Sequence, residues 1–315
     1  MRNLFALRAV AAAVDTAYQG RLLHALLDGD ATASDYAERL GLDPEATELI
    51  LDVLSEFGFA IRKRGRYVAS PSLTEAESLF GIDMAFLFWD RAPAFLLHGE
   101  RPGRMDASAD QREMAYADLV INLGRAYTEG ARELTEQLNG DPMHILDVGA
   151  GSGVWSLAMV RGRPQTRVTA LDFPKVLKAF QAFAAQLGLS AQTATLAGDA
   201  HTVDIPAGRF DRIIVANVLH LEPPERAAAL LRRLAAPLVS GGEIVIVDAA
   251  RGDTASSRRI FATYLLSRAL RTGGGKPHST YLIKRWLVQA GLTPELELQL
   301  SRAPHLRAVV ARKPR

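Results

Sequence analysis

A glycine-rich turn that follows an acidic residue is the strongest candidate for ligand chemistry in this chain. The segment HILDVGAGSG, residues 144–153, favours a strand up to Asp147 and then turns, and an apolar helical segment begins near Val154. A strand that ends on a carboxylate and turns tightly into a helix lets a nucleotide-like ligand contact bare backbone. The dinucleotide fingerprint G-x-G-x-x-G would need glycine at position 154, which is valine. The spacing D-x-G-x-G-x-G therefore does not call for a pyrophosphate.

Two more aspartates follow later strands in the same way. Asp172 closes the next candidate strand, and Asp199 follows the third in the sequence AGDA, residues 197–200. Each aspartate alone is a common turn former. Together with the glycine turn they form an ordered series that resembles the cofactor motifs of the class I S-adenosylmethionine (SAM) methyltransferases.

This resemblance implies that the chain binds SAM, releases S-adenosylhomocysteine and needs no metal. It implies that Asp172 accepts the two ribose hydroxyls and that Phe173, Asp199 and Ala200 meet the adenine. The methionyl end would meet the backbone of the glycine turn and Asp147, directly or through water. The predicted cofactor residues are Asp147, Gly149, Gly151, Gly153, Asp172, Phe173, Asp199, Ala200 and Asn217.

The order of apolar segments predicts the elements that would position these residues. Strand candidates at 144–148, 167–173, 193–198, 210–218 and 243–249 alternate with helical segments, which predicts a parallel sheet with helices on both faces. Two final strands, 295–302 and 305–313, form a terminal hairpin. We therefore predict an α/β fold with a doubly wound, mostly parallel seven-stranded sheet over 141–315, which resembles the class I methyltransferase fold.

Residues 1–70 predict three helices and a two-stranded wing, a winged helix. The third helix, within residues 43–60, carries five carboxylates and no lysine or arginine, so it would repel DNA phosphates. A dimerisation domain is the favoured interpretation, and the basic wing residues 62–66 are then a solvated turn. Residues 71–140 predict a helical linker whose aromatic stretch at 84–99 is either ordinary core or the wall of a substrate pocket.

A winged-helix domain, a helical linker and a SAM domain together resemble the small-molecule O-methyltransferases related to caffeate O-methyltransferase. That family has a catalytic histidine after the fourth strand, and His220 matches it. A histidine there could take the proton of a phenol during methyl transfer. Asp248 matches an acidic position that flanks the histidine and could hold its tautomer. The other interpretation of His220 is a strand-end residue that only lines the cofactor cleft.

The chain departs from the family pattern around this histidine. The Asp-Trp after the histidine is Leu221-Glu222, a lysine before it is Ala216, and Pro277 stands where the second flanking glutamate is expected. His278, next to that proline, could point into the pocket instead. Residues named as pocket candidates are Phe86, Trp89, Tyr127, Tyr264 and His278, while His24, His98, His144, His201 and His305 lack metal-ligand spacing and are expected to be structural or solvated.

The composition agrees with a small-molecule enzyme. The net charge is +2, 48% of residues are hydrophobic and there is no cysteine, which gives no sign of a nucleic-acid or membrane partner and excludes thiol chemistry. The apolar run at residues 9–14 is too short for a signal peptide, so we expect a cytoplasmic protein. We predict a homodimeric secondary-metabolism enzyme that methylates a hydroxyl of an apolar aromatic molecule. The alternatives are N-, C- or S-methylation, a non-methylating reaction (pericyclic, decarboxylation or hydroxylation), and a SAM-sensing winged-helix regulator.

Overall fold

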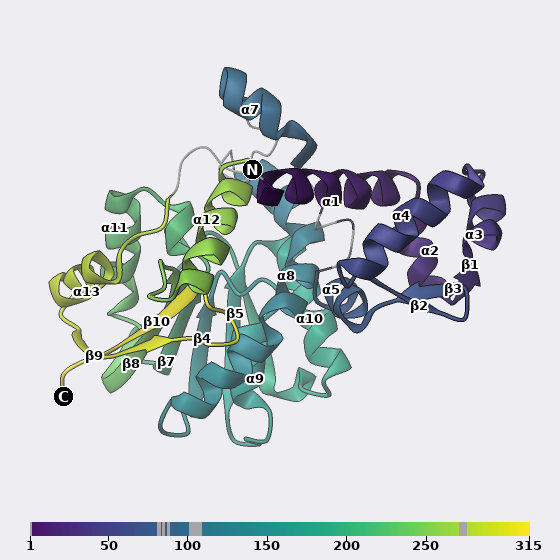
Figure 1. Ribbon diagram of the computed structural model, residues 1–315. Helices are drawn as coiled ribbons and strands as arrows, with labels where there is room; N and C mark the ends of the chain where they lie inside the picture. The colour runs from purple at the N-terminus through teal and green to yellow at the C-terminus, as the bar shows by residue number, and fades with distance from the viewer. Residues whose placement is uncertain (1, 81–82, 84–85, 87–88, 101–108, 271–275) are drawn as a thin grey trace. The chain divides into compact units, whose positions relative to one another are not determined.

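Seven segments after residue 143 form one twisted sheet in the computed structural model of the chain (Figure 1). The structure describes all residues except 1, 81–82, 84–85, 87–88, 101–108 and 271–275. Two compact units are present, Met1–Phe86 and Leu87–Arg315. Each unit is described below by itself.

The sheet of the second unit has the strand order β6-β5-β4-β7-β8-β10-β9. Its parallel strands are β4 (His144–Val148), β5 (Arg167–Asp172), β6 (Thr193–Ala197), β7 (Phe210–Ala216) and β8 (Leu238–Ala249). The hairpin β9 (Thr293–Gln299) and β10 (Leu306–Arg312) joins β8 in antiparallel register. The predicted seven-stranded α/β fold is therefore confirmed.

The connections between the strands place a crevice at the carboxyl ends of β4 and β7. From β4 the chain runs outward to β5 and β6 and then returns to pair β7 on the other side of β4. Such a reversal separates the loops that follow two neighbouring strands, and ligands of doubly wound sheets bind there. The loops after β4 and β7 carry the glycine turn and His220, respectively.

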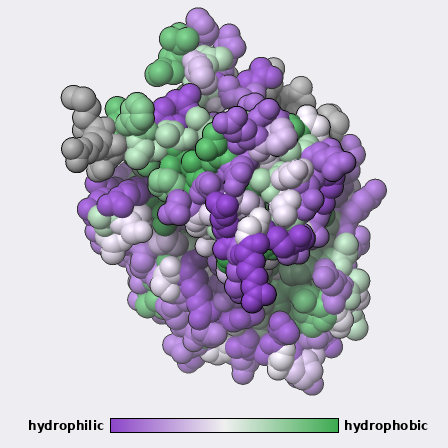
Figure 2. All heavy atoms as spheres, turned by 45° about the vertical axis from the view of Figure 1, so that its right-hand side comes forward, coloured by the Kyte–Doolittle hydropathy of each residue, from purple (hydrophilic) through white to green (hydrophobic). Residues whose placement is uncertain are grey.

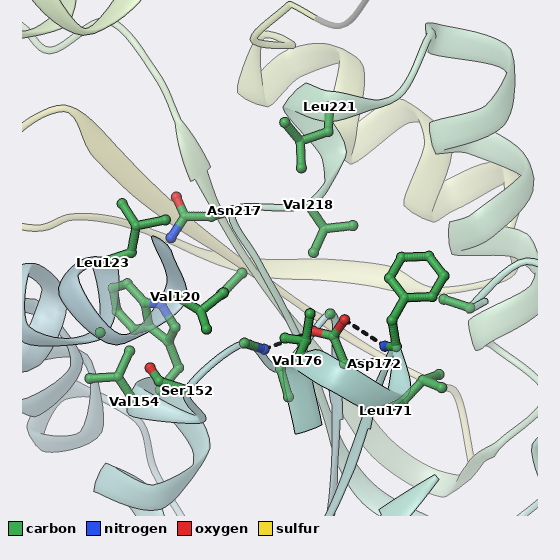
Figure 3. Close-up of a pocket in the computed structure, with 18 of the residues that line it drawn as sticks. Val120, Leu123, Ser152, Val154, Leu171, Asp172, Val176, Asn217, Val218 and Leu221 are labelled. Carbon is green, nitrogen blue, oxygen red and sulfur yellow. Dashed lines mark hydrogen bonds between the residues drawn. The ribbon is translucent and has the colours of Figure 1, made fainter. Parts of the chain in front are cut away.

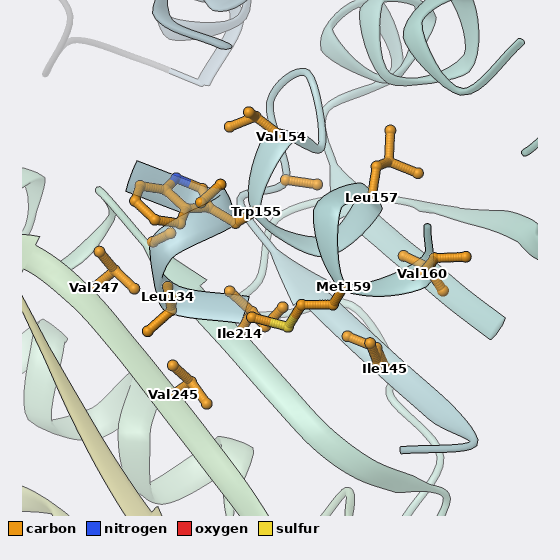
Figure 4. Close-up of a cluster of buried hydrophobic side chains, with 14 of the residues drawn as sticks. Leu134, Ile145, Val154, Trp155, Leu157, Met159, Val160, Ile214, Val245 and Val247 are labelled. Atoms are coloured by element: carbon orange, nitrogen blue, oxygen red, sulfur yellow. The ribbon is translucent and has the colours of Figure 1, made fainter. Parts of the chain in front are cut away.

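Helices cover both faces of the sheet because β-strand side chains alternate between faces. One apolar cluster joins Ile145 and Ile214 to the helices α8 (Ala109–Gln137), α9 (Val154–Val160) and α10 (Pro174–Gln186) (Figure 4). The second cluster joins Leu146 and Ile213 to α11 (Pro224–Leu234) and α13 (Thr280–Gln289). The remaining helical segments are η1 (Trp89–Arg91), α7 (Ala92–His98), η2 (Ser190–Gln192), η3 (Leu219–Leu221) and α12 (Ala255–Ala269).

The end of β7 and the start of β8 differ from the predicted bounds because of the local backbone conformation. β7 ends at Ala216 rather than 218 because Asn217 adopts a left-handed backbone, with φ of 58°. β8 begins at Leu238 rather than 243, since the Ser240–Gly242 stretch continues the strand instead of forming a turn. The irregular register between Phe210 and Arg212 accommodates this longer strand.

The first unit contains helices and a small sheet of order β1-β3-β2. Asp43 caps α4 and Pro44 starts it. The buried hydroxyl of Tyr36 lies 3.0 Å from the Tyr67 carbonyl oxygen and ties α3 to β3. The elements are α1 (Arg2–Gln19), α2 (Leu22–Asp28), β1 (Ala31–Thr32), α3 (Ala33–Leu40), α4 (Pro44–Glu56), β2 (Ala60–Lys63), β3 (Arg66–Ala69) and α5 (Pro71–Phe80).

The wing between β2 and β3 is tied to the acidic helix. The Arg62 guanidinium lies 3.1 Å from Glu48 and 2.7 Å from Asp52, both on α4. The Tyr67 hydroxyl donates to the same Asp52 carboxylate, and burial together with this contact raises the pKa of Tyr67 to about 12. One wing cation therefore pairs with two carboxylates on the helix of its own domain, where the sequence alone suggests a solvated turn.

The surface shown in Figure 2 is mostly hydrophilic, with hydrophobic side chains gathered in patches. Among the residues that the structure describes, no helix is both long and apolar enough to span a membrane.

The glycine turn offers a direct test of this packing. We expect Gly153→Ala to destabilise the protein by about 2–5 kcal/mol, because an L-residue at positive φ costs about 1–2 kcal/mol and overpacking about 1–3 kcal/mol more. A methyl group there would lie 2.4 Å from the Phe180 ring. Gly162→Ala is the matched control, since Gly162 has a similar φ of 81° but nothing within 4 Å. Equal urea midpoints for the two variants would contradict the packing argument.

Candidate active site

A cavity opens at the carboxyl ends of β4, β5 and β7, with an empty space of about 1000 Å³ that includes the part open to solvent (Figure 3). Of the predicted cofactor residues, Gly149, Gly151, Asp172, Phe173, Asp199, Ala200 and Asn217 line it, and Gly153 and Asp147 do not. Sequence reasoning missed a wall contributed by α8 and several residues from later loops. These are Val120, Leu123, Gly124, Val176, His201, Val218, Leu221, Glu222 and Leu230.

The glycine turn approaches its neighbours too closely for a side chain at Gly149 or Gly153. Gly149, Gly151 and Gly153 have φ of 65°, 56° and 77°. A methyl group on Gly149 would lie 2.5 Å from a Val218 methyl. The turn is also tied to β5, since the backbone N–H groups of Gly149 and Ala150 donate to the Leu171 carbonyl oxygen at 2.8 and 3.2 Å. The turn therefore presents backbone to the cavity and is held in place before any ligand is considered.

Asp172 joins the turn to the end of β5. One carboxylate oxygen accepts the Gly151 N–H at 2.8 Å and the other accepts the Phe173 N–H at 2.7 Å (Figure 3). Burial raises the pKa of Asp172 to about 6, although these two N–H bonds oppose the shift. Each carboxylate oxygen keeps a further lone pair, so Asp172 is able to accept hydroxyl protons from a ligand in the cavity.

Asp147 lies behind the turn. Alternation along β4 puts Asp147 on the same face as Ile145, toward α9, where the Ser156 hydroxyl donates to its carboxylate at 2.5 Å. Asp147 is 2% exposed, and burial, reinforced by the nearby Asp172 carboxylate, raises the pKa of Asp147 to about 7. The structure thus places this carboxylate with Ser156 rather than on the cavity wall, and its contact with a ligand stays a prediction.

Asp199 and Asn217 face the cavity from the loops after β6 and β7. Asp199 accepts the His201 N–H at 2.8 Å, which orders the loop that follows. The Asn217 side-chain oxygen is buried and has no hydrogen-bond partner among the described residues. An unpaired buried acceptor costs about 1–3 kcal/mol, so a donor on a bound ligand would relieve this cost.

His201 and Glu222 form a charged part of the wall that the sequence did not indicate. The His201 ring nitrogen lies 3.4 Å from a Glu222 oxygen, and Arg226 donates to the other Glu222 oxygen at 2.7 Å. Burial alone would raise the pKa of Glu222, but these two partners lower it to about 2. Sequence spacing gave no signal for this pair, because 21 positions of irregular loop and strand (222 − 201) separate the two residues.

His220 and Asp248 are brought together beside the cavity. The His220 Nδ1 lies 2.5 Å from Asp248 Oδ1, and the His220 backbone N–H donates to Asp248 Oδ2 at 3.0 Å. A carboxylate at Nδ1 holds the imidazole proton on that nitrogen and leaves the lone pair on Nε2. Nε2 lies 3.1 Å from the Tyr264 hydroxyl, and His220 itself is 6% exposed and does not line the cavity.

His278 supports the loop that carries His220. Its Nε2 lies 3.1 Å from both the Leu219 and the Glu222 carbonyl oxygens, at the two ends of η3. The ring packs edge-on against Trp286 at 4.9 Å. His278 is not on the cavity wall. In this structure it positions the loop rather than pointing into the pocket.

The aromatic candidates separate into different places. Tyr127 lines the cavity, and Tyr264 contacts His220. Phe86 stacks on Tyr18 at 3.9 Å within the first unit, and Trp89 is 36% exposed and absent from the cavity wall. Phe88 and the side chain of Tyr116 lie outside the described residues. Among the described residues, no group of three or more His, Asp or Glu side chains is arranged to hold a metal.

Comparisons with known proteins agree with this geometry. Residues 145–242 match the family model of a methyltransferase domain. The chain is 25% identical to 3-hydroxy-5-methyl-1-naphthoate 3-O-methyltransferase of Streptomyces sahachiroi, covering 98% of this chain and 92% of that enzyme. These matches support a class I SAM-dependent O-methyltransferase.

One further sequence relative and one solved structure are also similar to this chain. L-tyrosine C(3)-methyltransferase of Streptomyces lavendulae is 30% identical over 152 residues, which is 48% of this chain and 41% of that enzyme. The crystal structure of human N-acetylserotonin methyltransferase in complex with SAM has the same fold, with a TM-score of 0.73 at 19% identity over 98% of this chain and 94% of that one. The similarity in fold to this structure therefore extends well beyond residues 145–242, which match the family model.

The residues of the cavity suit SAM. A backbone-lined turn, the Asp172 carboxylate and the unpaired Asn217 oxygen offer contacts to a nucleoside with an ammonium-bearing tail. Asp172 would hold the ribose, Phe173, Asp199 and Ala200 the adenine, and the turn with Asn217 the methionyl end. When bound, SAM supplies a sulfonium methyl group that an acceptor atom can take in an in-line displacement.

We expect Asp172→Asn to weaken SAM binding by about tenfold or more, because two ribose hydroxyls would each lose about 1 kcal/mol when their charged acceptor becomes neutral. The wild-type affinity should be constant above the Asp172 pKa of about 6 and fall about tenfold per pH unit below it, where the carboxyl group gains a proton. Isothermal titration calorimetry from about pH 5 to about pH 8 measures both effects. The exposed Asp204→Asn is the control, and an Asp172→Asn affinity equal to the control's would remove the ribose assignment.

Proposed function

We propose that this methyltransferase transfers a methyl group from SAM to a hydroxyl of an apolar, aromatic small molecule, with His220 as general base. The observation that carries this proposal is the His220–Asp248 pair, whose imidazole nitrogen is held 2.5 Å from a buried carboxylate oxygen next to the cofactor cavity. The chain retains this pair, although Pro277 replaces the second acidic residue expected from the family.

The pair suits proton transfer from a hydroxyl. Asp248 is 3% exposed and accepts the Nδ1 proton, so Nε2 is the nitrogen available to take a proton. As the acceptor oxygen loses its proton, the imidazolium that forms is stabilised by the adjacent carboxylate. Such base catalysis is worth typically about 10²–10⁴ in rate.

The cavity wall supports an apolar acceptor. The part of the wall contributed by α8 and α9 includes the apolar and aromatic side chains of Val120, Leu123, Tyr127 and Trp155. Ligand sites of this kind combine apolar and aromatic surface with a few directed polar groups. The naphthoate relative, whose name specifies O-methylation of a hydroxylated naphthoate, points to the same acceptor class.

Carbon methylation is the second candidate. It is favoured by the tyrosine C(3)-methyltransferase relative, whose name specifies methylation of an aromatic carbon. A base that removes a phenol proton also activates the ring carbon next to that hydroxyl, so the same pair would serve both reactions. Carbon-13 NMR of the product from isotopically labelled SAM separates an O-methyl from a C-methyl resonance.

We expect His220→Ala to lower kcat by about 10²–10⁴ while SAM affinity changes less than about twofold, because the imidazole does not line the cofactor cavity. His144→Ala is the matched control, since the His144 side chain is 51% exposed at the start of β4. Turnover of a polycyclic phenol panel with labelled SAM measures kcat, and calorimetry measures SAM affinity. A His220→Ala enzyme as fast as the His144→Ala enzyme would remove the base role.

We also propose that the chain forms a homodimer through its first unit. Three large apolar side chains of α1 support this, since Leu4, Phe5 and Leu7 are 73%, 82% and 68% exposed. An exposed apolar row on one helix is typical of a surface that a partner covers.

Light scattering after size-exclusion chromatography tests the dimer. We expect the wild-type protein to have twice the chain mass and the double variant Leu4→Glu/Phe5→Glu to have the mass of one chain, because two buried carboxylates would face a desolvation cost. Val288→Glu on α13 is the control, since Val288 is 60% exposed in the second unit. A monomeric wild-type protein at micromolar concentration would contradict the proposal.

A further inference from the structure

The Nε2 atom of His220, which the proposed function uses, is covered by a tyrosine. Tyr264 on α12 places its hydroxyl 3.1 Å from this nitrogen, and its ring meets the imidazole edge-on at 6.0 Å. Because Asp248 holds the imidazole proton on Nδ1, Nε2 is the acceptor and the Tyr264 hydroxyl is the donor. In this arrangement a proton reaches Nε2 either through the Tyr264 hydroxyl or after that hydroxyl is displaced.

His220 is held where it is from several sides. Both Asp248 oxygens bind it, one at Nδ1 and one at the backbone N–H. The Arg268 guanidinium donates to the His220 carbonyl oxygen at 3.3 Å, and His278 binds the carbonyl groups at both ends of η3. A movement of the loop into the cavity would break these backbone bonds together, and a rotation of the His220 side chain alone would break its 2.5 Å contact with Asp248. The tyrosine hydroxyl is therefore the forward end of the base assembly.

The surroundings of Tyr264 connect it to the cavity wall. Its ring lies 5.1 Å from the His305 ring, and His305 Nε2 lies 3.4 Å from the Tyr127 hydroxyl. Tyr127 lines the cavity. Burial, and to a smaller extent the nearby His220, lowers the pKa of His305 to about 4, so this imidazole is neutral near pH 7 and adds no charge. A neutral polar strip thus runs from the cavity wall to the base.

We propose that Tyr264 relays the acceptor's proton to His220. As the acceptor oxygen takes up the methyl group, its O–H bond breaks and the proton passes to the Tyr264 oxygen. The proton already on Tyr264 passes in the same step to His220 Nε2, so tyrosine stays neutral and histidine becomes an imidazolium beside Asp248. This inference rests on the proposed function, because it uses the same base.

The relay also selects the acceptor class. Passing a proton between two phenols costs little free energy, because donor and acceptor are chemically alike. An aliphatic alcohol is a far weaker acid than a phenol, and its proton would move uphill to a tyrosine oxygen. The relay therefore suits phenols and enols as acceptors and disfavours aliphatic alcohols.

Tyr264→Phe tests the relay, since it removes one oxygen and keeps the ring. With 1-naphthol as acceptor, we expect kcat to fall about 10²-fold or more with KM nearly unchanged. With 4-nitro-1-naphthol, which is already ionised at about pH 8, the loss should shrink to a few-fold, because no proton needs to move. The exposed Tyr281→Phe, 74% exposed on α13, is the matched control. Unchanged or faster turnover by Tyr264→Phe would show that the acceptor displaces the tyrosine and would overturn the relay.

Two further readouts separate this inference from the proposed function. If His220→Ala loses activity and Tyr264→Phe does not, the relay alone fails, whereas if both variants stay active the base role fails as well. If the wild-type enzyme methylates neither naphthol, the acceptor class fails. Nitrogen-15 NMR of His220 then decides the relay without turnover: the Nε2 resonance should shift between wild type and Tyr264→Phe, and an unmoved resonance would overturn the hydrogen bond on which the relay depends.

Discussion

The close approach of the glycine turn to its neighbours is the constraint on which the site depends. The turn fits only if Val218, after β7, and Phe180, on α10, come within contact distance of backbone that carries no side chain. This contact sets how the ends of β4 and β7 meet, and so where the loop bearing His220 begins. The cofactor cavity and the base loop are therefore built on the same packed junction, and a change in either side chain would be felt by both.

Much of the fold follows from local signals in the sequence. Each apolar run that alternates with a helical segment became a strand of the sheet, because two buried faces demand strongly apolar strands and parallel pairing demands a crossover helix. The ends of β7 and β8 were less predictable. They depend on one left-handed asparagine and on a Ser-Gly-Gly stretch that is compatible with either a turn or a strand.

The site was predictable in its motifs and less so in its contacts. Asp172 and Asn217 lie on the cavity wall, whereas Asp147 faces α9, which alternation from the buried Ile145 already implies. The contacts of Tyr264 and His305 could not be predicted. These residues come from a helix and a hairpin loop 41 positions apart (305 − 264), and only the packing of α12 against the sheet brings them together.

The Asp172 carboxylate has a consequence for the entropy of cofactor binding. It already accepts two backbone N–H groups, one of them from the glycine turn, with no ligand needed to order that turn. The conformational freedom of the turn is thus lost when the chain folds rather than when the cofactor arrives. Cofactor encounter then resembles the docking of two rigid bodies, and discrimination among adenosine-containing molecules depends on complementarity of shape and charge rather than on loop closure.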